Sequence, residues 1–199
     1  MNDVEKRSYA LGCDVGNNFK MMNLSIEKDS FAQGVMDALA GKIAMTDAEL
    51  SAQFELINKE LEERQRKQAS AEKEAGEKFL AENKVKDGVV TTASGLQYKV
   101  ITMGTGVKPS ATETVKVHYH GTLIDGTVFD SSVQRGEPIE FPLNRVIKGW
   151  TEGLQLMPAG SKFIFYIPSD LAYGEASPSP LIKPNSTLIF EVELLDVRK

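Results

Sequence analysis

Residues 117–132 read VHYHGTLIDGTVFDSS, and this stretch joins a strand pattern to a tight turn. It belongs to a longer segment, ETVKVHYHGTLI, in which apolar and polar residues alternate as they do in a half-buried β-strand. Asp125-Gly126 then predicts a turn, after which Phe129 and Asp130 stand side by side. A large aromatic residue next to a carboxylate indicates the wall of an apolar ligand pocket that has one polar point.

Four more segments after residue 94 read as strands, and Gly or Pro turns separate them. Their sequences are GLQYKVI, IEFPL, SKFIFYIP and STLIFEVELLDV. A short helix is expected at Val146–Leu156. About five antiparallel strands around one helix make an α+β domain.

Before Lys84 the apolar residues recur at the spacing of helices. The first stripe consists of Tyr9, Cys13, Gly16 and Phe19. Gly12 and Gly16 allow a second helix to approach closely. The second stripe, Phe31–Leu39, ends at Gly41, a residue typical of a helix C-terminal cap.

A third helix begins at the capping box Thr46-Asp47-Ala48-Glu49, but its later part, EERQRKQASAEKEAGEK, has no apolar stripe. If the helix continues from Asp47 to about Asn83, its length is about 55 Å at 1.5 Å per residue. A flexible charged linker is the alternative, because Gly76 lowers helix stability by about 1 kcal/mol. The alanines and the Glu/Lys pairs at helical spacing favour the helix.

The two short helices and the start of the third bury little apolar surface by themselves. Small domains of this kind commonly need oligomerisation for stability. We therefore expect these helices to pair with a second copy of the chain. The alternative is that they pack on the C-terminal half of the same chain, but the long polar stretch would hold the two halves apart.

The composition argues against two classes of protein. A formal net charge of -5 argues against a nucleic-acid binder, which usually has a basic face. No apolar run approaches the ~18 residues that a membrane-spanning helix needs, so we expect no membrane span. The single cysteine, Cys13, excludes an intrachain disulfide, and we expect it to be a small buried apolar residue.

The first residues, MNDVEKRSYALG, show neither an apolar leader nor a small-residue cleavage site. We therefore expect a cytoplasmic protein. The alternative is a periplasmic or outer-membrane-associated protein whose signal peptide has been removed.

Sequence motifs of nucleotide binding, serine hydrolysis and zinc proteolysis are absent. His118 and His120, the two histidines, face the same side of one predicted strand, and a zinc site would need further ligands. No Cys or third His stands near them, so exposed strand residues are the simpler interpretation. We expect neither a metal nor a cofactor.

Aromatic and aliphatic residues stand near the ends of the predicted strands, and each one alone reads as a core residue. They are Tyr119, Phe129, Phe141, Val146, Ile147, Trp150, Tyr173 and Phe190. Asp130 beside Phe129 favours a pocket, as do the hydroxyls of Tyr119 and Tyr173, which need partners when buried. The segment VIKGW also ends a strand and begins a helix, where free backbone N–H groups occur.

Five ordered segments resemble the FKBP-type peptidyl-prolyl cis-trans isomerase domain. They read VHYHGTLIDGTVFDSS, EPIEFP, VIKGWTEGLQLMPAGSK, IPSDLAYG and TLIFEVELL, and the resemblance runs from about Gly95 to the C-terminus. The segment YALGCDVGNNFK and the long third helix resemble the dimerisation module of bacterial Mip-like and FkpA-like isomerases.

The resemblance implies an α+β fold in which a half-barrel antiparallel sheet wraps on a short helix. It implies a helical dimerisation domain with a long connecting helix at residues 1–83, a linker at 84–94 and the isomerase domain at 95–199. Departures from the family pattern are His120, Ile139 and a proline-containing loop, YGEASPSPLIKPNST.

The resemblance also assigns roles to the pocket residues. Trp150 forms the floor, and the walls and edge come from Tyr119, Phe129, Phe141, Val146, Ile147, Ile182 and Phe190. The Ile147 backbone N–H and the Tyr173 hydroxyl bind carbonyls of the substrate. Asp130, together with Tyr119, orients polar groups at the rim.

The implied function is isomerisation of X-Pro bonds during protein folding, in a homodimer that also acts as a chaperone. Unfolded proline-containing proteins are the expected clients, and macrolide inhibitors are further implied ligands. The chemistry needs no nucleophile, only a dry site that prefers a twisted amide to a planar one. Two alternatives are a module that binds proline segments without catalysis and a purely structural dimer.

Overall fold

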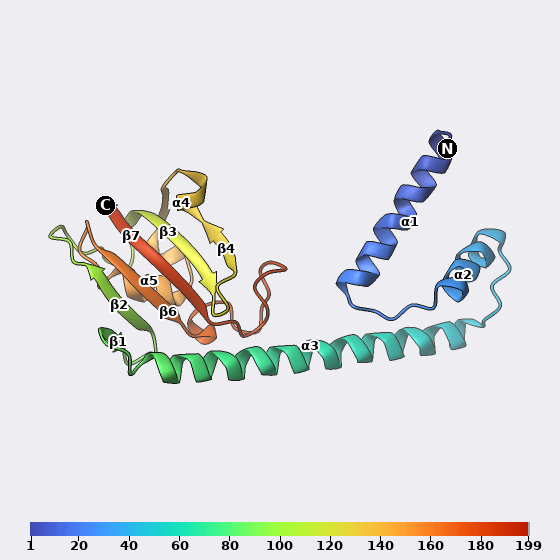
Figure 1. Ribbon diagram of the computed structural model, residues 1–199, viewed down its shortest axis with the longest axis horizontal. Coiled ribbons are helices and arrows are strands. Elements are labelled where there is room, and N and C mark those ends of the chain that lie inside the picture. Colours follow the sequence, from blue (N-terminus) through green and yellow to red (C-terminus); the bar gives the residue numbers. More distant parts are fainter. Residues whose placement is uncertain (199) are drawn as a thin grey trace. The chain divides into compact units, whose positions relative to one another are not determined.

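The computed structural model describes residues 1–198, which form two units (Figure 1). The first unit spans Met1–Arg64 and the second begins at Gln65. The helix α3 (Asp47–Asn83) starts in the first unit and ends in the second. No helix among the described residues is long and apolar enough to cross a membrane.

The first unit consists of α1 (Asp3–Met21), α2 (Lys28–Ala40) and the beginning of α3. The predicted caps are confirmed, because Gly41 ends α2 with a left-handed φ of 66° and Thr46 and Glu49 bond each other's backbone N–H groups. Neither α1 nor α2 has a buried residue. Cys13 is therefore exposed, and the prediction that it is buried is wrong for the single chain.

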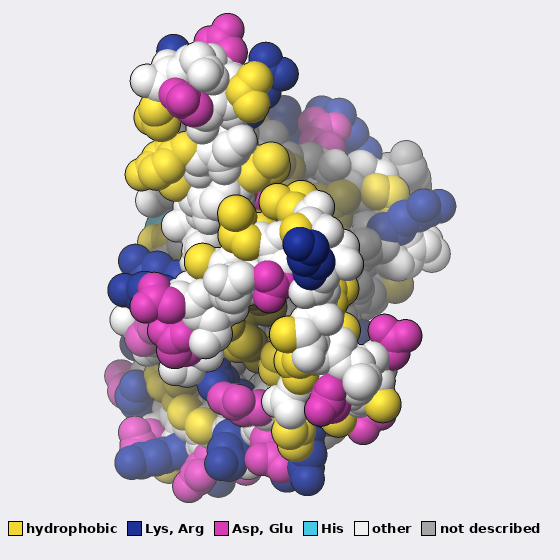
Figure 2. Space-filling model, turned by 90° about the vertical axis from the view of Figure 1, so that its right-hand side faces the viewer, with side chains coloured by type: hydrophobic (Ala, Val, Ile, Leu, Met, Phe, Trp, Pro, Cys, Tyr) yellow, Lys and Arg dark blue, Asp and Glu magenta, His cyan; other side chains and the backbone are white. Residues whose placement is uncertain are grey.

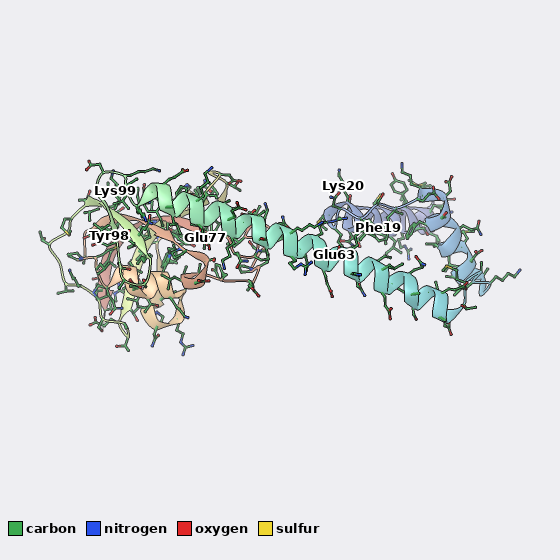
Figure 3. The ribbon with its side chains drawn as sticks, turned by 90° about the horizontal axis from the view of Figure 1, so that it is seen from below. Phe19, Lys20, Glu63, Glu77, Tyr98 and Lys99 are labelled. Carbon is green, nitrogen blue, oxygen red and sulfur yellow. The ribbon has the colours of Figure 1, made fainter. Side chains whose placement is uncertain are left out.

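The third helix is continuous over 37 residues, so the predicted helix is confirmed and the flexible linker is wrong. Its second half has a contact face that the apolar pattern did not reveal. This α3 stripe, spaced three and four residues apart, consists of Ala69, Glu72, Gly76, Phe79 and Asn83. Figure 3 shows Glu77 on this second half, beside the domain that carries Tyr98 and Lys99 on its second strand.

Each member of the α3 stripe lies in the second unit and contacts the sheet or a loop of that unit. The Phe79 ring lies 6.0 Å from the ring of Tyr166, and the buried Asn83 side chain donates to Gln97 at 2.9 Å. Gly76 lies so close to Thr187 that a Cβ at residue 76 would be 3.2 Å from the Thr187 Cβ. The division between the two units lies at 64/65, within α3. The expected domain boundary at 83/84 stays a prediction.

The second unit contains one antiparallel sheet, which does not close into a barrel within the described residues. Its strands are β1 (Val89–Thr91), β2 (Gln97–Thr102), β3 (Thr114–Leu123), β4 (Val128–Ser131), β5 (Ile139–Pro142), β6 (Lys162–Ile167) and β7 (Leu188–Arg198). Their order is β1-β2-β6-β7-β3-β4, and β5 pairs with β3. The five predicted strands are present. Two further strands, β1 within the predicted linker and β4, were missed because VVT and VFDS do not alternate apolar and polar residues.

The short helix α5 (Lys148–Leu154) packs on β6 through two glycines. A Cβ on Gly149 would overlap the Ile167 side chain, and a Cβ on Gly153 would overlap the Phe165 ring. These close approaches bring α5 down on the inner face of the sheet, whose buried side chains include Val117, Phe165 and Val192. Three shorter helices complete the unit: α4 (Ser132–Arg135), η1 (Leu143–Arg145) and η2 (Ser169–Leu171).

The contact between Gly76 and Thr187 predicts that Gly76→Ala destabilises the protein, the opposite of the usual effect of this substitution in a helix. In a free helix, Ala is favoured over Gly by about 1 kcal/mol, so helix propensity alone predicts that Gly76→Ala stabilises the protein. Because the added methyl group would overlap Oγ1 of Thr187, we expect a net loss of about 1–3 kcal/mol of unfolding free energy. Urea unfolding of the full chain measures it.

The double variant Gly76→Ala/Thr187→Ala is the matched control. It removes the overlapping oxygen, so it should recover most of the lost stability. A single Gly76→Ala variant more stable than the wild type would show that α3 does not pack here as described.

Candidate active site

A pocket of about 650 Å³ opens on the inner side of the sheet in the second unit. Strands β3, β4, β5 and β7, the start of α5 and the loop after η2 all contribute to it. The lining residues are Tyr119, Phe129, Asp130, Ile139, Phe141, Arg145, Val146, Ile147, Trp150, Tyr173, Pro178, Ser179, Ile182 and Phe190.

Trp150 on α5 forms the floor of the pocket, and other rings surround it. Its ring centroid lies 5.0 Å from that of Phe190 and 5.3 Å from that of Tyr119, both at nearly perpendicular angles. Phe141 lies 5.4 Å from the indole, and Phe129 meets Phe190 edge to face at 5.3 Å. Edge-to-face packing suits the charge distribution of aromatic rings and holds their orientations. The rings support one another while leaving the centre of the pocket open.

Gly121 on β3 makes this ring arrangement possible. A Cβ at this position would lie 2.7 Å from the Phe129 ring and 2.9 Å from the Phe190 ring. Any side chain would therefore push both rings away from the strand. The glycine in the segment HYHG lets two pocket walls rest directly on the backbone of β3.

Three polar side chains form a cluster at one edge of the pocket. The Tyr119 hydroxyl donates to Asp130 Oδ2, and Arg135 Nη1 forms an ion pair with Asp130 Oδ1. Arg135 Nη2 also donates to the Tyr119 hydroxyl oxygen at 2.9 Å. Sequence reasoning missed Arg135, because an arginine five positions after the acid carries no motif. The one-turn helix α4, closed by the left-handed Gly136, brings it back over Asp130.

The environment holds Asp130 and Tyr119 of the cluster, and the nearby Tyr173, each in one protonation state near neutral pH. Burial alone would raise the pKa of Asp130, but hydrogen bonds from Tyr119 and Arg135 and the guanidinium charge outweigh it and lower the pKa. Burial, followed by the hydrogen bond to Asp130, raises the pKa of Tyr119. Burial, followed by the Asp130 charge, raises the pKa of Tyr173. The pocket thus contains one ionised carboxylate and two neutral hydroxyls.

Three potential donors in the pocket have no hydrogen-bond partner among residues 1–198. Ile147 is the N-cap residue of α5, and within residues 1–198 its backbone N–H has no hydrogen-bond partner. The Tyr173 hydroxyl likewise has no partner in the described part of the chain, and the residue is 40% exposed. Trp150 Nε1 on the floor is buried and also lacks a partner there. Such donors can meet carbonyl oxygens of a bound peptide.

The structure places all ten predicted site residues around this pocket. It adds Ile139, Arg145, Pro178 and Ser179, of which the last two come from the proline-containing loop. The two histidines lie outside the lining, and each is half-buried instead of exposed as expected. The reason is that their Nδ1 atoms lie at hydrogen-bond distance from serine hydroxyls, 3.1 Å for Ser132 and 3.0 Å for Ser131.

Comparison with known proteins gives matches over both units. The family described as FKBP-type peptidyl-prolyl cis-trans isomerase matches residues 105–195. The family described as the domain amino terminal to FKBP-type peptidyl-prolyl isomerase matches residues 4–100.

Individual relatives match almost the whole chain. The FKBP-type peptidyl-prolyl cis-trans isomerase FkpA of Aeromonas hydrophila is 48% identical over 98% of this chain and 76% of its own length. The Outer membrane protein MIP of Legionella longbeachae is 45% identical over 99% of this chain and 87% of its own length. The crystal structure of FkpA from Escherichia coli superposes with a TM-score of 0.75 at 39% identity, covering 100% of this chain and 98% of that one.

The pKa directions predict how the catalytic efficiency of the pocket depends on pH. Since the pKa of Asp130 is lowered and those of Tyr119 and Tyr173 are raised, the three groups keep their states between about pH 5 and pH 9. We expect kcat/KM for a proline peptide to be flat in this range. It should fall at lower pH, where Asp130 gains a proton and its ion pair is lost.

The Arg135→Gln variant is the control for this profile. Without the guanidinium, the pKa of Asp130 should move up, and the acidic fall in activity should shift to higher pH with it. A titration of the wild-type activity between pH 6 and pH 8 would contradict the assignment of the cluster.

Proposed function

Since the chain belongs to the FKBP-type peptidyl-prolyl cis-trans isomerase family and is an isomerase of this class, we propose that the pocket above Trp150 is the site where it turns X-Pro bonds during protein folding. The observation that supports this site best is the open ring-walled pocket of about 650 Å³. A prolyl ring is apolar and compact, so it suits a cavity with aromatic walls and few polar groups.

The uncatalysed reaction is slow for an electronic reason. Resonance holds the C–N bond planar, and rotation faces a barrier of about 18–20 kcal/mol. When the bond twists, resonance is lost and charge leaves the carbonyl oxygen, so the twisted amide is less polar than the planar one. A dry aromatic site disfavours the planar ground state more than the twisted state, which lowers the barrier between them.

Besides desolvation, the polar groups of the pocket orient the bound peptide. Ile147 N–H and the Tyr173 hydroxyl bind substrate carbonyls and hold the peptide on both sides of the rotating bond. Asp130 holds the Tyr119 hydroxyl and Arg135 in place at the rim. A thousandfold acceleration needs only about 4 kcal/mol, which desolvation with one or two hydrogen bonds can supply. No covalent intermediate and no proton transfer take part.

In this proposal the protein works as a homodimer formed by the first unit. Apolar side chains lie exposed on this unit and need cover: Tyr9, Leu11, Phe31, Val35, Met36, Leu39, Ile43, Phe54 and Leu56. Figure 2 shows many hydrophobic side chains on the surface that faces the viewer. No atom lies within 4 Å of a Cβ built on Gly12 or Gly16, so another helix can approach α1 closely there. Exposed apolar surface of this kind is typical of an interface.

The clients, the ligands and the compartment follow from the same proposal. Two pockets in one dimer can hold an unfolded proline-containing protein at two points, which supports chaperone action. Macrolide inhibitors would enter the same apolar pocket. For the compartment, the name of the Legionella longbeachae relative, Outer membrane protein MIP, favours the periplasm or the outer membrane over the expected cytoplasm.

Truncation of the pocket walls tests the proposed site and its mechanism. We expect Phe129→Ala to lower kcat/KM tenfold or more, since it opens the wall that excludes water. Asp130→Ala should lower it only about threefold to tenfold, because the carboxylate orients other groups and moves no proton. A protease-coupled peptide assay measures both variants.

The matched control is Tyr98→Ala, which removes an aromatic ring packed on Phe163 outside the pocket. It should lose stability but keep its activity while folded. Abolished activity in a folded Asp130→Ala protein would replace the desolvation mechanism with acid–base chemistry. A wild type that binds proline peptides without accelerating their exchange would leave only a binding module.

The dimer is tested by placing charges on the exposed face of α2. In the double variant Val35→Glu/Leu39→Glu the two carboxylates lie one helical turn apart, and we expect the dimer to dissociate. Sedimentation equilibrium should give the mass of two chains for the wild type and of one chain for the variant. The control Val107→Glu places a charge on an exposed residue of the second unit and should leave the dimer intact. A wild type with the mass of one chain at micromolar concentration would overturn the proposal.

A further inference from the structure

We propose that the second half of α3 positions the rim of the proline pocket and thereby sets how tightly extended substrates bind. The inference rests on the proposed function of the pocket and adds a role for Glu72, Ala69 and Gly76. These residues lie outside the pocket and act through the loop at residues 172–187. They are positioning residues for the isomerase reaction.

The loop at residues 172–187 supplies one side of the pocket. Tyr173, Pro178, Ser179 and Ile182 all come from it, and the Ile182 side chain is buried. The loop contains neither a helix nor a strand. Its internal hydrogen bonds include Asn185 N–H to Gly174 O at 2.7 Å and Ser177 Oγ to Ile182 O at 2.7 Å. Most of its other internal hydrogen bonds join residues three or fewer positions apart, so they form local turns, and contacts from another element help to hold the whole loop in one conformation.

The α3 stripe contacts the end of the loop at every second residue: Lys183, Asn185 and Thr187. Lys183 Nζ lies 2.7 Å from Glu72 Oε1, and Asn185 Nδ2 donates to Ala69 O at 3.3 Å. Thr187 lies against Gly76 just before β7 begins. The three anchors follow Ile182 directly along the chain, so they fix the end of the loop from which Ile182 turns into the pocket.

Two of these contacts, those of Asn185 and of Lys183, have features that suit an anchor for the loop. Asn185 adopts a left-handed conformation with φ of 63°, which asparagine adopts more readily than most other residues with a side chain. Its side chain bonds α3, and its backbone N–H closes the loop on Gly174. The Glu72–Lys183 pair is only partly exposed, with 23% of the Glu72 side chain accessible. Solvent therefore screens this pair less than the surface pairs of α1.

The anchors should affect binding more than chemistry. A substrate that reaches Ile182 and Pro178 must order the loop if α3 does not hold it, and that ordering weakens binding. The rings around Trp150 also hold one another by edge-to-face contacts, so the turnover of a bound substrate should change little. Loss of an anchor therefore predicts a higher KM at a nearly constant kcat.

A charge swap in the full chain tests the proposal. We compare Glu72→Lys, Lys183→Glu and the double swap with the wild type, using a proline peptide of about ten residues and a four-residue peptide. Each single variant should raise KM for the longer peptide about threefold to fivefold, the range of a partly exposed ion pair, with kcat within about twofold. The double swap should restore KM, and the short peptide should respond less.

Glu74→Lys is the matched control, because it makes the same charge change two residues further along α3 at an exposed position. It should leave KM and kcat unchanged. The proposal is overturned if the single variants keep the wild-type KM, if the swap does not restore it, or if kcat falls in proportion to the melting temperature. Failure of the proposed function itself looks different, since the wild type would then fail to accelerate exchange in either peptide.

Discussion

The edge-to-face packing of aromatic rings around Trp150 is the constraint on which the rest of the site depends. Rings from three strands and α5 support one another, so they enclose a space without collapsing into it. Gly121 on β3 and the two glycines of α5 are the backbone conditions for this packing, because any Cβ there would displace a wall or lift the floor. The sheet and its helix thus keep an apolar cavity open to one side. We propose that the X-Pro bond enters this cavity from water before it rotates.

In the proposed mechanism, the polar groups at the rim orient the substrate without acid–base chemistry. Asp130 stays ionised because Tyr119 and Arg135 satisfy it, and Tyr119 stays neutral beside it. Tyr119, Asp130 and Arg135 thus hydrogen-bond to one another, whereas the Ile147 N–H and the Tyr173 hydroxyl have no partner in the described part of the chain and are available to a substrate. The long helix α3 adds a further layer, since its contact face links the end of the pocket loop to a rigid element.

Much of the fold and of the site could be predicted from the sequence, and the exceptions have physical reasons. Alternation identified five of the strands, and the capping box and Gly41 marked helix ends, because these signals are local. The α3 stripe was missed because its members are Ala, Glu, Gly, Phe and Asn, which share a face but include only one large apolar residue. Arg135 was missed because only the turn of α4 brings it to Asp130. Cys13 is exposed because no other described element of the same chain buries a residue of α1.

Trp150 is the one tryptophan of the chain, so its fluorescence reports directly on the floor of the pocket. The most direct test of the central claim is to titrate the protein with a proline peptide while recording this fluorescence and the rate of cis–trans exchange. The account predicts a saturable change in indole emission with the same half-saturation concentration as the rate, and no change with a peptide in which alanine replaces proline. Accelerated exchange with unchanged indole emission would contradict it, because the reaction would then take place elsewhere.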